Sequence, residues 1–430
     1  MSKPRFVISC PYDTYSGYGA RSRDLVKAII ELDKYKVELL PQRWGDTSWG
    51  FCMDHPEWNF LYKHQAKQDW QKSQPEIWMQ ITIPNEFQPV GKYNIGCTAG
   101  IESTACKAEW IQGLNRMDTN WVSSHFAKST FDKMVYDRKD QNTGQVLEQI
   151  KLNKPVEVVF EGANLDLYHP MPASQIKNIS LKDIKEQFCY LFVGHWMNGE
   201  FGHDRKNVGV LVESFYEAFK NKRGSKPALI LKASSGVSSY ISRDTILDKI
   251  KAIRDKVGGS NLPNIYLLSG EFNDYEMNEL YNHPKVKAMV SFTKGEGYGR
   301  PLLEFSLVGK PIIASGWSGH LDFLDKNSVV LLGGHLENIH DSVVNDWLIK
   351  EAQWFQVNKQ QGISALKQVY KKYKQYAKNG TKQRFFASSN YSFENMKQLV
   401  GKKLVDNVPD FPKQVELELP KLELPKLNKV

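Results

Sequence analysis

The sequence predicts an α/β protein with two Rossmann-like domains that face a central cleft. Short runs rich in β-branched residues alternate with longer helical patterns, which is typical of parallel β/α units. This alternation starts twice, each time with its own first strand. A chain of 430 residues is also long enough for two hydrophobic cores.

The first series of strands predicts an N-terminal domain over residues 1–170. Between its first two strands, residues 20–32 place Leu25, Ala28, Ile29 and Leu32 on one helical face. The expected strands are 6–9, 37–40, 77–83, 94–98, 120–123 and 156–160.

The second series predicts another Rossmann-like domain over residues 188–345. Residues 171–187, which follow Pro170, are polar with a helical pattern, and we expect them to form the linker. The expected strands are 189–193, 228–232, 265–268, 288–292, 311–314 and 329–332.

The C-terminal part has two different patterns. Residues 346–406 are helical in pattern, and we expect them to pack back on the domains. Residues 407–430 contain the repeated sequence Leu-Glu-Leu-Pro-Lys, in which proline recurs every fifth residue and prevents a regular helix. We expect a flexible or surface-draped tail, and docking as an extended strand on a partner is the alternative.

Composition indicates a soluble, cytoplasmic protein. Hydrophobic residues make up 41% and charged residues 24%, and no apolar run reaches the ~18 residues of a membrane span. The chain enters its first strand without a signal-peptide core. The five cysteines lack the spacing of zinc or redox motifs, so we expect thiols in a reducing compartment.

Residues 288–304 carry the most informative motif, a strand followed by a glycine-rich turn and a helix that begins near Pro301. Turn amides without side chains can bind an anion such as a diphosphate. Glu304 lies among apolar residues, where a carboxylate needs partners such as the vicinal hydroxyls of a ribose. Glu296, in the turn, would face a sugar. The alternative is an exposed Glu296 with Glu304 paired to a lysine.

In this context the two glutamates resemble the Glu-x7-Glu motif of family-4 glycosyltransferases. The similarity is strong over residues 188–325 and weaker over 1–170. The whole chain, including its Leu-Pro-Lys tail, also resembles glycosyltransferases of large tailed marine phages, which would place it in the host cytoplasm. The resemblance implies a GT-B fold, retention of anomeric configuration, no bound metal, and a nucleotide sugar such as a UDP- or GDP-sugar as co-substrate without a further cofactor.

The resemblance also assigns roles around the glycine-rich turn. Glu296 would contact the donor sugar and Glu304 would hold the ribose. Backbone amides of Gly297, Tyr298 and Gly299 would contact the diphosphate or the sugar.

Two cations early in the second domain complete the implied donor site. Lys206 matches a family lysine that binds the diphosphate. The family usually has an arginine directly after the glycine that ends the first strand, whereas here Gly194 is followed by His195. Arg205 is the candidate for the missing positive charge, and two solvated surface cations are the alternative.

In the first domain, Gly17 and Gly19 belong to a loop that matches the glycine-rich loop beneath donor and acceptor in the family. A tight β–α turn is the alternative reading. Arg21, at the start of the helix that follows, is a candidate sugar or acceptor contact. Glu102 occupies the region where many members have a histidine close to the donor sugar and is the candidate substitute, and a carboxylate at the start of a helix is the alternative. Four tryptophans between residues 44 and 70 could stack on sugar or base, although core packing is the favoured explanation for most of them.

The positive charge is concentrated between Lys367 and Arg384, where seven cations occur without an acid and three tyrosines are interleaved. A solvated helix face, with the tyrosines packed on the domain beneath, explains this pattern. The alternative is an anionic acceptor, either DNA or another polyanion. Sequence does not identify the acceptor or the oligomeric state. A GT-B epimerase and a non-catalytic nucleotide-sugar or nucleic-acid binding protein are the competing functions.

Overall fold

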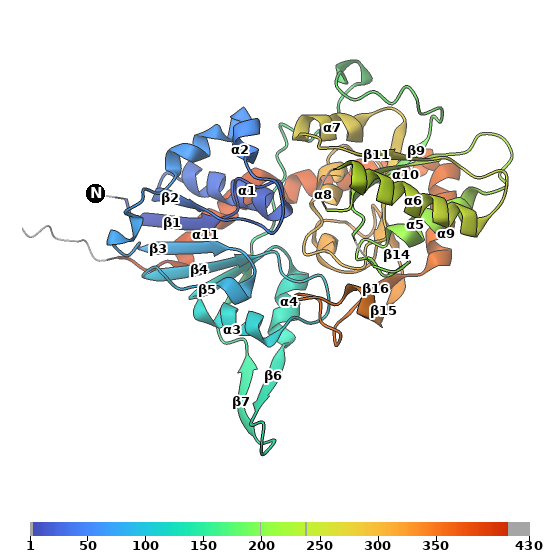
Figure 1. Ribbon diagram of the computed structural model, residues 1–430. Helices are drawn as coiled ribbons and strands as arrows, with labels where there is room; N and C mark the ends of the chain where they lie inside the picture. The colour runs from blue at the N-terminus through green and yellow to red at the C-terminus, as the bar shows by residue number, and fades with distance from the viewer. Residues whose placement is uncertain (1–2, 198, 237–238, 412–430) are drawn as a thin grey trace, which may run out of the picture.

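The computed structural model describes residues 3–197, 199–236 and 239–411. These residues form two α/β lobes, each built on a six-stranded parallel sheet (Figure 1). The two sheets are the two series of strands that the sequence predicts. The predicted class, two Rossmann-like domains, is therefore confirmed.

The N-terminal sheet has the strand order β2-β1-β3-β4-β5-β8. It contains all six strands that the sequence predicts for this domain, with small differences at their ends. Helices on its faces include α1 (Gly17–Glu31), α3 (Ala108–Arg116) and α4 (His125–Lys133). The strands are β1 (Arg5–Cys10), β2 (Lys36–Pro41), β3 (Ile77–Ile81), β4 (Tyr93–Thr98), β5 (Thr119–Val122) and β8 (Val156–Val158).

The C-terminal sheet has the order β11-β10-β9-β12-β13-β14. Its central strands are β9 and β12, so the loops that follow them lie side by side at the carboxyl edge of the sheet. The strands are β9 (Cys189–His195), β10 (Ala228–Ser234), β11 (Ile265–Leu268), β12 (Val286–Ser291), β13 (Ile312–Ser315) and β14 (Val330–Leu332), and the helices between them are α5 (Val208–Phe219), α6 (Tyr240–Val257), α7 (Asp274–Asn282) and α8 (Arg300–Ser306).

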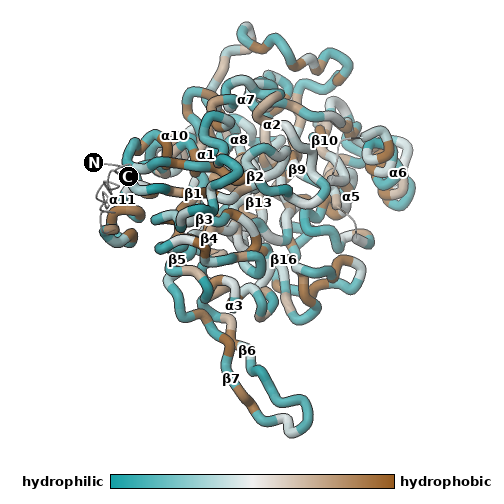
Figure 2. The backbone as a smooth tube through the Cα atoms, turned by 60° about the vertical axis from the view of Figure 1, so that its left-hand side comes forward, coloured by the Kyte–Doolittle hydropathy of each residue, from teal (hydrophilic) through white to brown (hydrophobic). Residues whose placement is uncertain are grey.

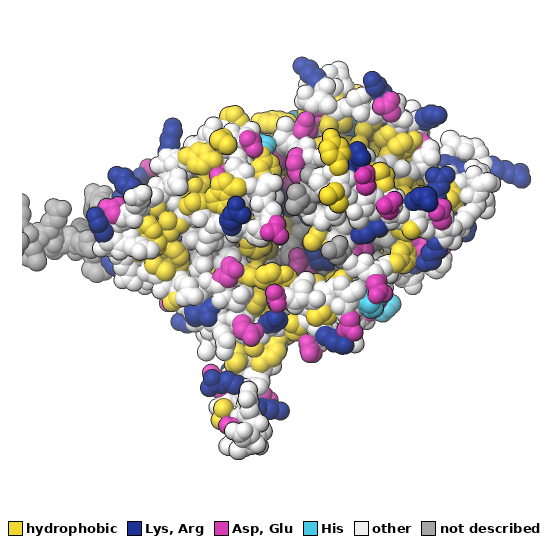
Figure 3. Space-filling view, viewed as in Figure 1, with side chains coloured by type: hydrophobic (Ala, Val, Ile, Leu, Met, Phe, Trp, Pro, Cys, Tyr) yellow, Lys and Arg dark blue, Asp and Glu magenta, His cyan; other side chains and the backbone are white. Residues whose placement is uncertain are grey.

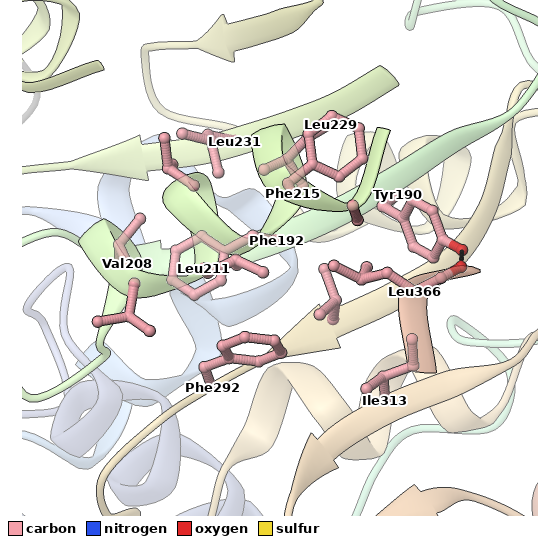
Figure 4. Close-up of a cluster of buried hydrophobic side chains, with 14 of the residues drawn as sticks. Tyr190, Phe192, Val208, Leu211, Phe215, Leu229, Leu231, Phe292, Ile313 and Leu366 are labelled. Atoms are coloured by element: carbon pink, nitrogen blue, oxygen red, sulfur yellow. Dashed lines mark hydrogen bonds between the residues drawn. The ribbon is translucent and has the colours of Figure 1, made fainter. Parts of the chain in front are cut away.

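A core of aromatic and aliphatic side chains holds α5 and α9 (Lys359–Lys371) against one face of this sheet (Figure 4). Phe192 and Phe292 project from the sheet region toward Leu211 of α5. The hydroxyl of Tyr190 donates a 2.6 Å hydrogen bond to the carbonyl of Leu366 in α9. That bond satisfies a polar group that would otherwise be buried without a partner.

Two antiparallel hairpins were not predicted. One pairs β6 (Val135–Lys139) with β7 (Val146–Lys151) and projects away from the N-terminal lobe (Figures 1 and 2). The other pairs β15 (Gly334–Asn338) with β16 (Gln353–Val357) in the C-terminal lobe. The prediction that residues 346–406 are helical throughout is therefore wrong at its start, because residues 353–357 form the second strand of a hairpin.

The C-terminal helices connect the lobes. Helix α9 packs on the C-terminal domain, α10 (Tyr373–Asn390) runs past α8, and α11 (Phe393–Asn407) lies against α1 of the N-terminal domain (Figure 1). Lys397 of α11 forms a 3.1 Å ion pair with Glu31 of α1. The chain thus returns to its first domain, while the Leu-Pro-Lys tail, expected over 407–430, lies mostly outside the described residues.

The helical pattern expected over 171–187 is also wrong. Only Ala173–Gln175 forms a single 3-10 turn. Glu279 of α7 accepts hydrogen bonds from the amides of residues 177–179, and the side chains of Leu181 and Ile184 are buried in the C-terminal domain. These amides donate to the Glu279 side chain instead of to the backbone carbonyls of a helix.

All five cysteines are buried and unpaired. No helix in the described part of the chain combines the length and apolar character needed to cross a membrane.

Candidate functional site

Two basic residues and one acidic residue meet where the loops after β9 and β12 leave the C-terminal sheet. Lys206 Nζ lies 2.5 Å from Glu296 Oε1, and Arg205 Nη1 lies 3.4 Å from Glu296 Oε2. Arg205 Nη1 also lies 3.5 Å from Glu102 of the N-terminal domain. The structure therefore brings together Glu296, the adjacent pair Arg205 and Lys206, and Glu102, which come from three segments far apart in the sequence.

The carboxyl group of Glu296 is buried and held as an anion. Burial alone would raise its pKa, but Lys206 and Arg205 outweigh burial and lower the pKa of Glu296 to about 2. Burial lowers the pKa of Lys206, and Glu296 opposes that shift. Ser318, which the sequence analysis did not single out, accepts a 2.9 Å hydrogen bond from the Glu296 amide.

The glycine-rich turn contacts the N-terminal domain directly. A methyl group on Gly297 would lie 2.6 Å from the Ala99 carbonyl oxygen, and one on Gly295 would lie 2.0 Å from that of Glu102. Ser124 Oγ donates a 2.7 Å hydrogen bond to the Gly297 carbonyl. These glycines are therefore needed for close approach of the two domains, a reason that sequence alone did not reveal.

The turn ends where α8 begins, as predicted. Gly299 has φ +98°, a left-handed conformation that favours glycine, and Pro301 is the second residue of α8. The Tyr298 side chain is buried in the C-terminal core, so this residue can offer a ligand only its backbone. His320, which is not among the predicted site residues, lies against Gly299. Its ring nitrogen Nε2 is 2.7 Å from the Ser315 carbonyl oxygen.

Glu304 is buried, with polar partners from α7 and α8. Tyr281 donates a 3.1 Å hydrogen bond to Glu304 Oε2, and Arg300 Nε lies 3.1 Å from Oε1. Burial raises the pKa of Glu304 to about 7, against the opposing effect of Arg300. A hydroxyl-donating ligand would give this carboxylate the partners that its burial requires.

Arg300 joins this site to the N-terminal domain. Its Nη1 lies 2.5 Å from Asp24 in α1 and 3.8 Å from Glu161, which follows β8. Sequence analysis missed all three of these residues. Arg300 directly follows the glycine-rich turn, so its charge could have marked it as a site residue from the sequence. No pattern in the sequence marks Asp24 or Glu161 in this way.

The predicted residues of the first domain have distinct environments. Gly17 is exposed, with open space where a side chain would lie, whereas a methyl group on Gly19 would lie 2.3 Å from the Thr14 carbonyl oxygen. Ser16 caps α1 by accepting a 2.9 Å hydrogen bond from the Gly19 amide. Arg21 is buried and donates to the Val159 carbonyl at 3.0 Å, so it lies within the domain and not on the cleft surface.

The basic stretch is divided between α9 and α10, which meet at Lys372. Tyr370 and Tyr373 pack edge-on against Phe188, with ring centroids 4.9 and 5.4 Å away, and Tyr376 donates a hydrogen bond to Gln368. The tyrosines therefore pack on the domain beneath. Within the described residues, none of the seven cations forms an ion pair.

Within the same described ranges, no group of three or more His, Cys, Asp or Glu side chains is arranged to hold a metal ion. The surface between the lobes is hollowed (Figure 3), and a cavity of about 610 Å³ is lined by residues of both domains there, including Arg205 and Glu102.

No protein-family model and no curated protein matches the sequence. Among solved structures, HepE from Anabaena in complex with UDP-glucose is similar, with TM-score 0.61 and 11% identity over 94% of this chain and 100% of that one. Sucrose-phosphate synthase from Thermosynechococcus elongatus is similar with a TM-score of 0.60 and 12% sequence identity, over 94% of this chain and 98% of that one. A glycosyltransferase from Rickettsia africae is similar with a TM-score of 0.59 and 13% sequence identity, over 96% of this chain and 100% of that one. The likeness confirms the predicted GT-B fold.

Proposed function

We propose that this protein is a glycosyltransferase that moves a sugar from a UDP- or GDP-sugar to an acceptor hydroxyl, with retention of anomeric configuration. The observation that carries the proposal is the contact of Lys206 and Arg205 with Glu296 where the two domains meet. The similarity to HepE, whose structure contains UDP-glucose, supports a nucleotide-sugar donor.

The two cations suit a leaving diphosphate. Cleavage of the bond between the anomeric carbon and the phosphate oxygen leaves negative charge on the diphosphate, and preorganised cations stabilise that charge. Lys206 and Arg205 already lie beside the glycine turn, held by Glu296 and by the Gly295 carbonyl, which accepts a 3.0 Å hydrogen bond from Arg205. Binding of a diphosphate would add an anionic partner without requiring the cations to be assembled.

The carboxylates suit hydroxyl groups. Among the described residues, Tyr281 and Arg300 are the side-chain partners of the buried Glu304, and two vicinal ribose hydroxyls can donate to its oxygens. Glu296, held as an anion, can accept from hydroxyls of the transferred sugar. In this proposal the backbone amides of Gly297 and Gly299, which carry no side chains, contact the diphosphate or the sugar.

In this mechanism the transfer takes place on one face of the sugar. The bond from the anomeric carbon to the leaving phosphate breaks, the bond to the acceptor oxygen forms on the same face, and the acceptor proton passes to the leaving phosphate oxygen. The chain then supplies positioning and charge stabilisation, and no protein nucleophile is needed. The products are the glycosylated acceptor and a nucleoside diphosphate.

The test is incubation of the protein with a panel of UDP-, GDP- and ADP-sugars, with detection of free nucleoside diphosphate. Slow release from one donor, unchanged in EDTA, is expected, whereas loss in EDTA would refute the metal-free mechanism. An altered sugar with no need for an acceptor would instead identify an epimerase. Tight binding without turnover in the presence of a broad acceptor panel would identify a non-catalytic binding protein.

Once an acceptor is known, NMR of the product tests retention. Donor and product should have the same anomeric configuration, and inversion would refute the same-face mechanism.

A further inference from the structure

The cavity between the lobes opens beside the cation cluster, because Arg205 and Glu102 line it while Arg205 also contacts Glu296. Its volume of about 610 Å³ lies within the range of small-molecule sites. A molecule in it would therefore lie next to the proposed reaction centre.

Its walls come from both domains and are rich in aromatic rings. On the N-terminal side, Trp44 stacks on Tyr18 with ring centroids 3.7 Å apart, so Tyr18 supports the indole from one side. Tyr18 lies between Gly17 and Gly19, and its hydroxyl accepts a 3.0 Å hydrogen bond from the Ala99 amide. The glycine-rich loop thus positions a wall of this cavity.

Another part of the wall is the segment between β15 and β16. It contributes Trp347, whose side chain is 46% exposed, and Leu348, which packs against the core of the N-terminal domain. The segment is held across the domain boundary by reciprocal 2.8 Å hydrogen bonds between Thr104 and Gln353. The cavity is therefore complete only when the two domains are together.

The charges of the cavity balance. Its ionisable lining residues are Arg43, Glu86, Glu102 and Arg205, two cations and two anions. Arg205 is already shared between Glu102 and Glu296, and in the proposed function its positive charge serves the donor diphosphate and not a second anion in the cavity. No residue of the basic stretch from Lys367 to Arg384 lines the cavity. A polyanion would lose hydration here without gaining compensating charge.

We propose that this cavity binds the acceptor, and that the acceptor is an uncharged saccharide. This inference rests on the proposed transferase function. A pyranose ring has an apolar C–H face that packs on indole rings such as those of Trp44 and Trp347, while its hydroxyls can donate to carboxylates such as Glu86 and Glu102. Arg205 and Glu102 place the bound hydroxyl next to the donor site.

The experiment compares wild type with Trp44→Ala, Trp347→Ala and Trp49→Ala. Trp49 is a matched control, because it is 41% exposed on the N-terminal domain and does not line the cavity. Saturation-transfer NMR measures binding of maltose, cellobiose and lactose, and of single-stranded oligothymidylate as the anionic probe. Calorimetry with UDP and GDP is run on every variant.

We expect at least one neutral disaccharide to bind wild type and Trp49→Ala alike, and to bind the other two variants roughly tenfold more weakly. Nucleoside diphosphate binding should be the same in all four proteins. Equal disaccharide binding in all variants, or binding of oligothymidylate alone, would overturn the saccharide proposal while leaving the transferase proposal intact. Absence of UDP and GDP binding in wild type would instead count against the donor site.

Discussion

Arg300 Nη1 in the C-terminal domain lies 2.5 Å from Asp24 Oδ2 in the N-terminal domain. The same guanidinium holds Glu304, the carboxylate assigned to the donor ribose. One side chain therefore connects the proposed nucleotide site with the contact between the domains.

Replacing Arg300 with methionine should destabilise the protein and open the cleft. Asp24, Glu161 and Glu304 would lose a shared cation, and removing one partner of a buried ion pair costs about 3–5 kcal/mol. A lower thermal unfolding midpoint and a larger radius of gyration by X-ray scattering are expected. In the control, Asp24→Asn weakens the contact between the domains, although Glu161 and Glu304 still contact Arg300, and it should enlarge the particle with little loss of nucleotide affinity. An unchanged radius in both variants would contradict the link.

Replacing Glu304 with alanine should weaken nucleotide binding as well as turnover. Loss of a buried acceptor for ribose hydroxyls costs about 1–3 kcal/mol, or roughly 5- to 150-fold in the dissociation constant of the nucleoside diphosphate. Calorimetry measures this constant directly. Wild-type affinity in the variant would show that Glu304 does not hold the ribose.

The raised pKa of Glu304 should link nucleotide affinity to pH. Burial brings this pKa from 4.5 to about 7, so the carboxyl group keeps its proton over a window in which free glutamate is ionised. Ribose hydroxyls favour the ionised form, and affinity should therefore fall roughly tenfold per pH unit below about 7. Calorimetry in buffers of different ionisation enthalpy should detect proton release on binding, and Glu304→Gln should show none at this site.

The same shift predicts how stability depends on pH. Because the folded-state pKa is above the unfolded one, the stability that Glu304 contributes is fully present below pH 4.5 and is lost as pH rises to about 7. The thermal unfolding midpoints of wild type and Glu304→Gln should agree near pH 4.5. As pH rises towards about 7, the midpoint of the glutamine variant should increase relative to that of wild type. A constant difference across this window would contradict the shifted pKa.

Lys206→Ala should weaken binding of a nucleoside diphosphate far more than binding of the nucleoside. The reason is that Lys206 would act on the diphosphate and lies far from the base in this assignment. Equal losses for both ligands would indicate a folding defect. Glu296→Gln should mainly lower turnover, because it acts on the transferred sugar, and steady-state kinetics beside calorimetry separates the two effects.

Gly297→Ala should impair the approach of the domains. The added methyl group would lie 2.6 Å from the Ala99 carbonyl oxygen. This oxygen belongs to the backbone, so it cannot move aside as the end of a flexible side chain could. Turnover should fall more than affinity for the nucleoside diphosphate, since in the proposed function the C-terminal domain supplies most of the donor contacts. Gly17→Ala is the matched control, because open space surrounds that position. A similar effect of both substitutions would argue against domain contact as the cause.

Much of the architecture could be read from local sequence. Buried parallel strands are short β-branched runs between amphipathic helices, so strands such as 6–9 and 189–193 were recognised before their partners were known. The hairpin over 135–151 was missed because its strands are largely exposed and lack that pattern. Residues 171–187 looked helical, but Glu279 supplies their amides with another acceptor, a contact about one hundred positions away.

The sequence by itself determined the two-domain α/β class and the motif that contains Glu296, Gly297, Gly299 and Glu304, because these depend on periodicity and on neighbouring residues. Only the tertiary structure decided that Lys206 and Arg205 meet Glu296, that Arg21 is internal, and that Arg300 reaches Asp24. Those contacts join loops from different strands and helices of different domains. Their distances are set by sheet order and domain approach, which leave no local pattern in the chain.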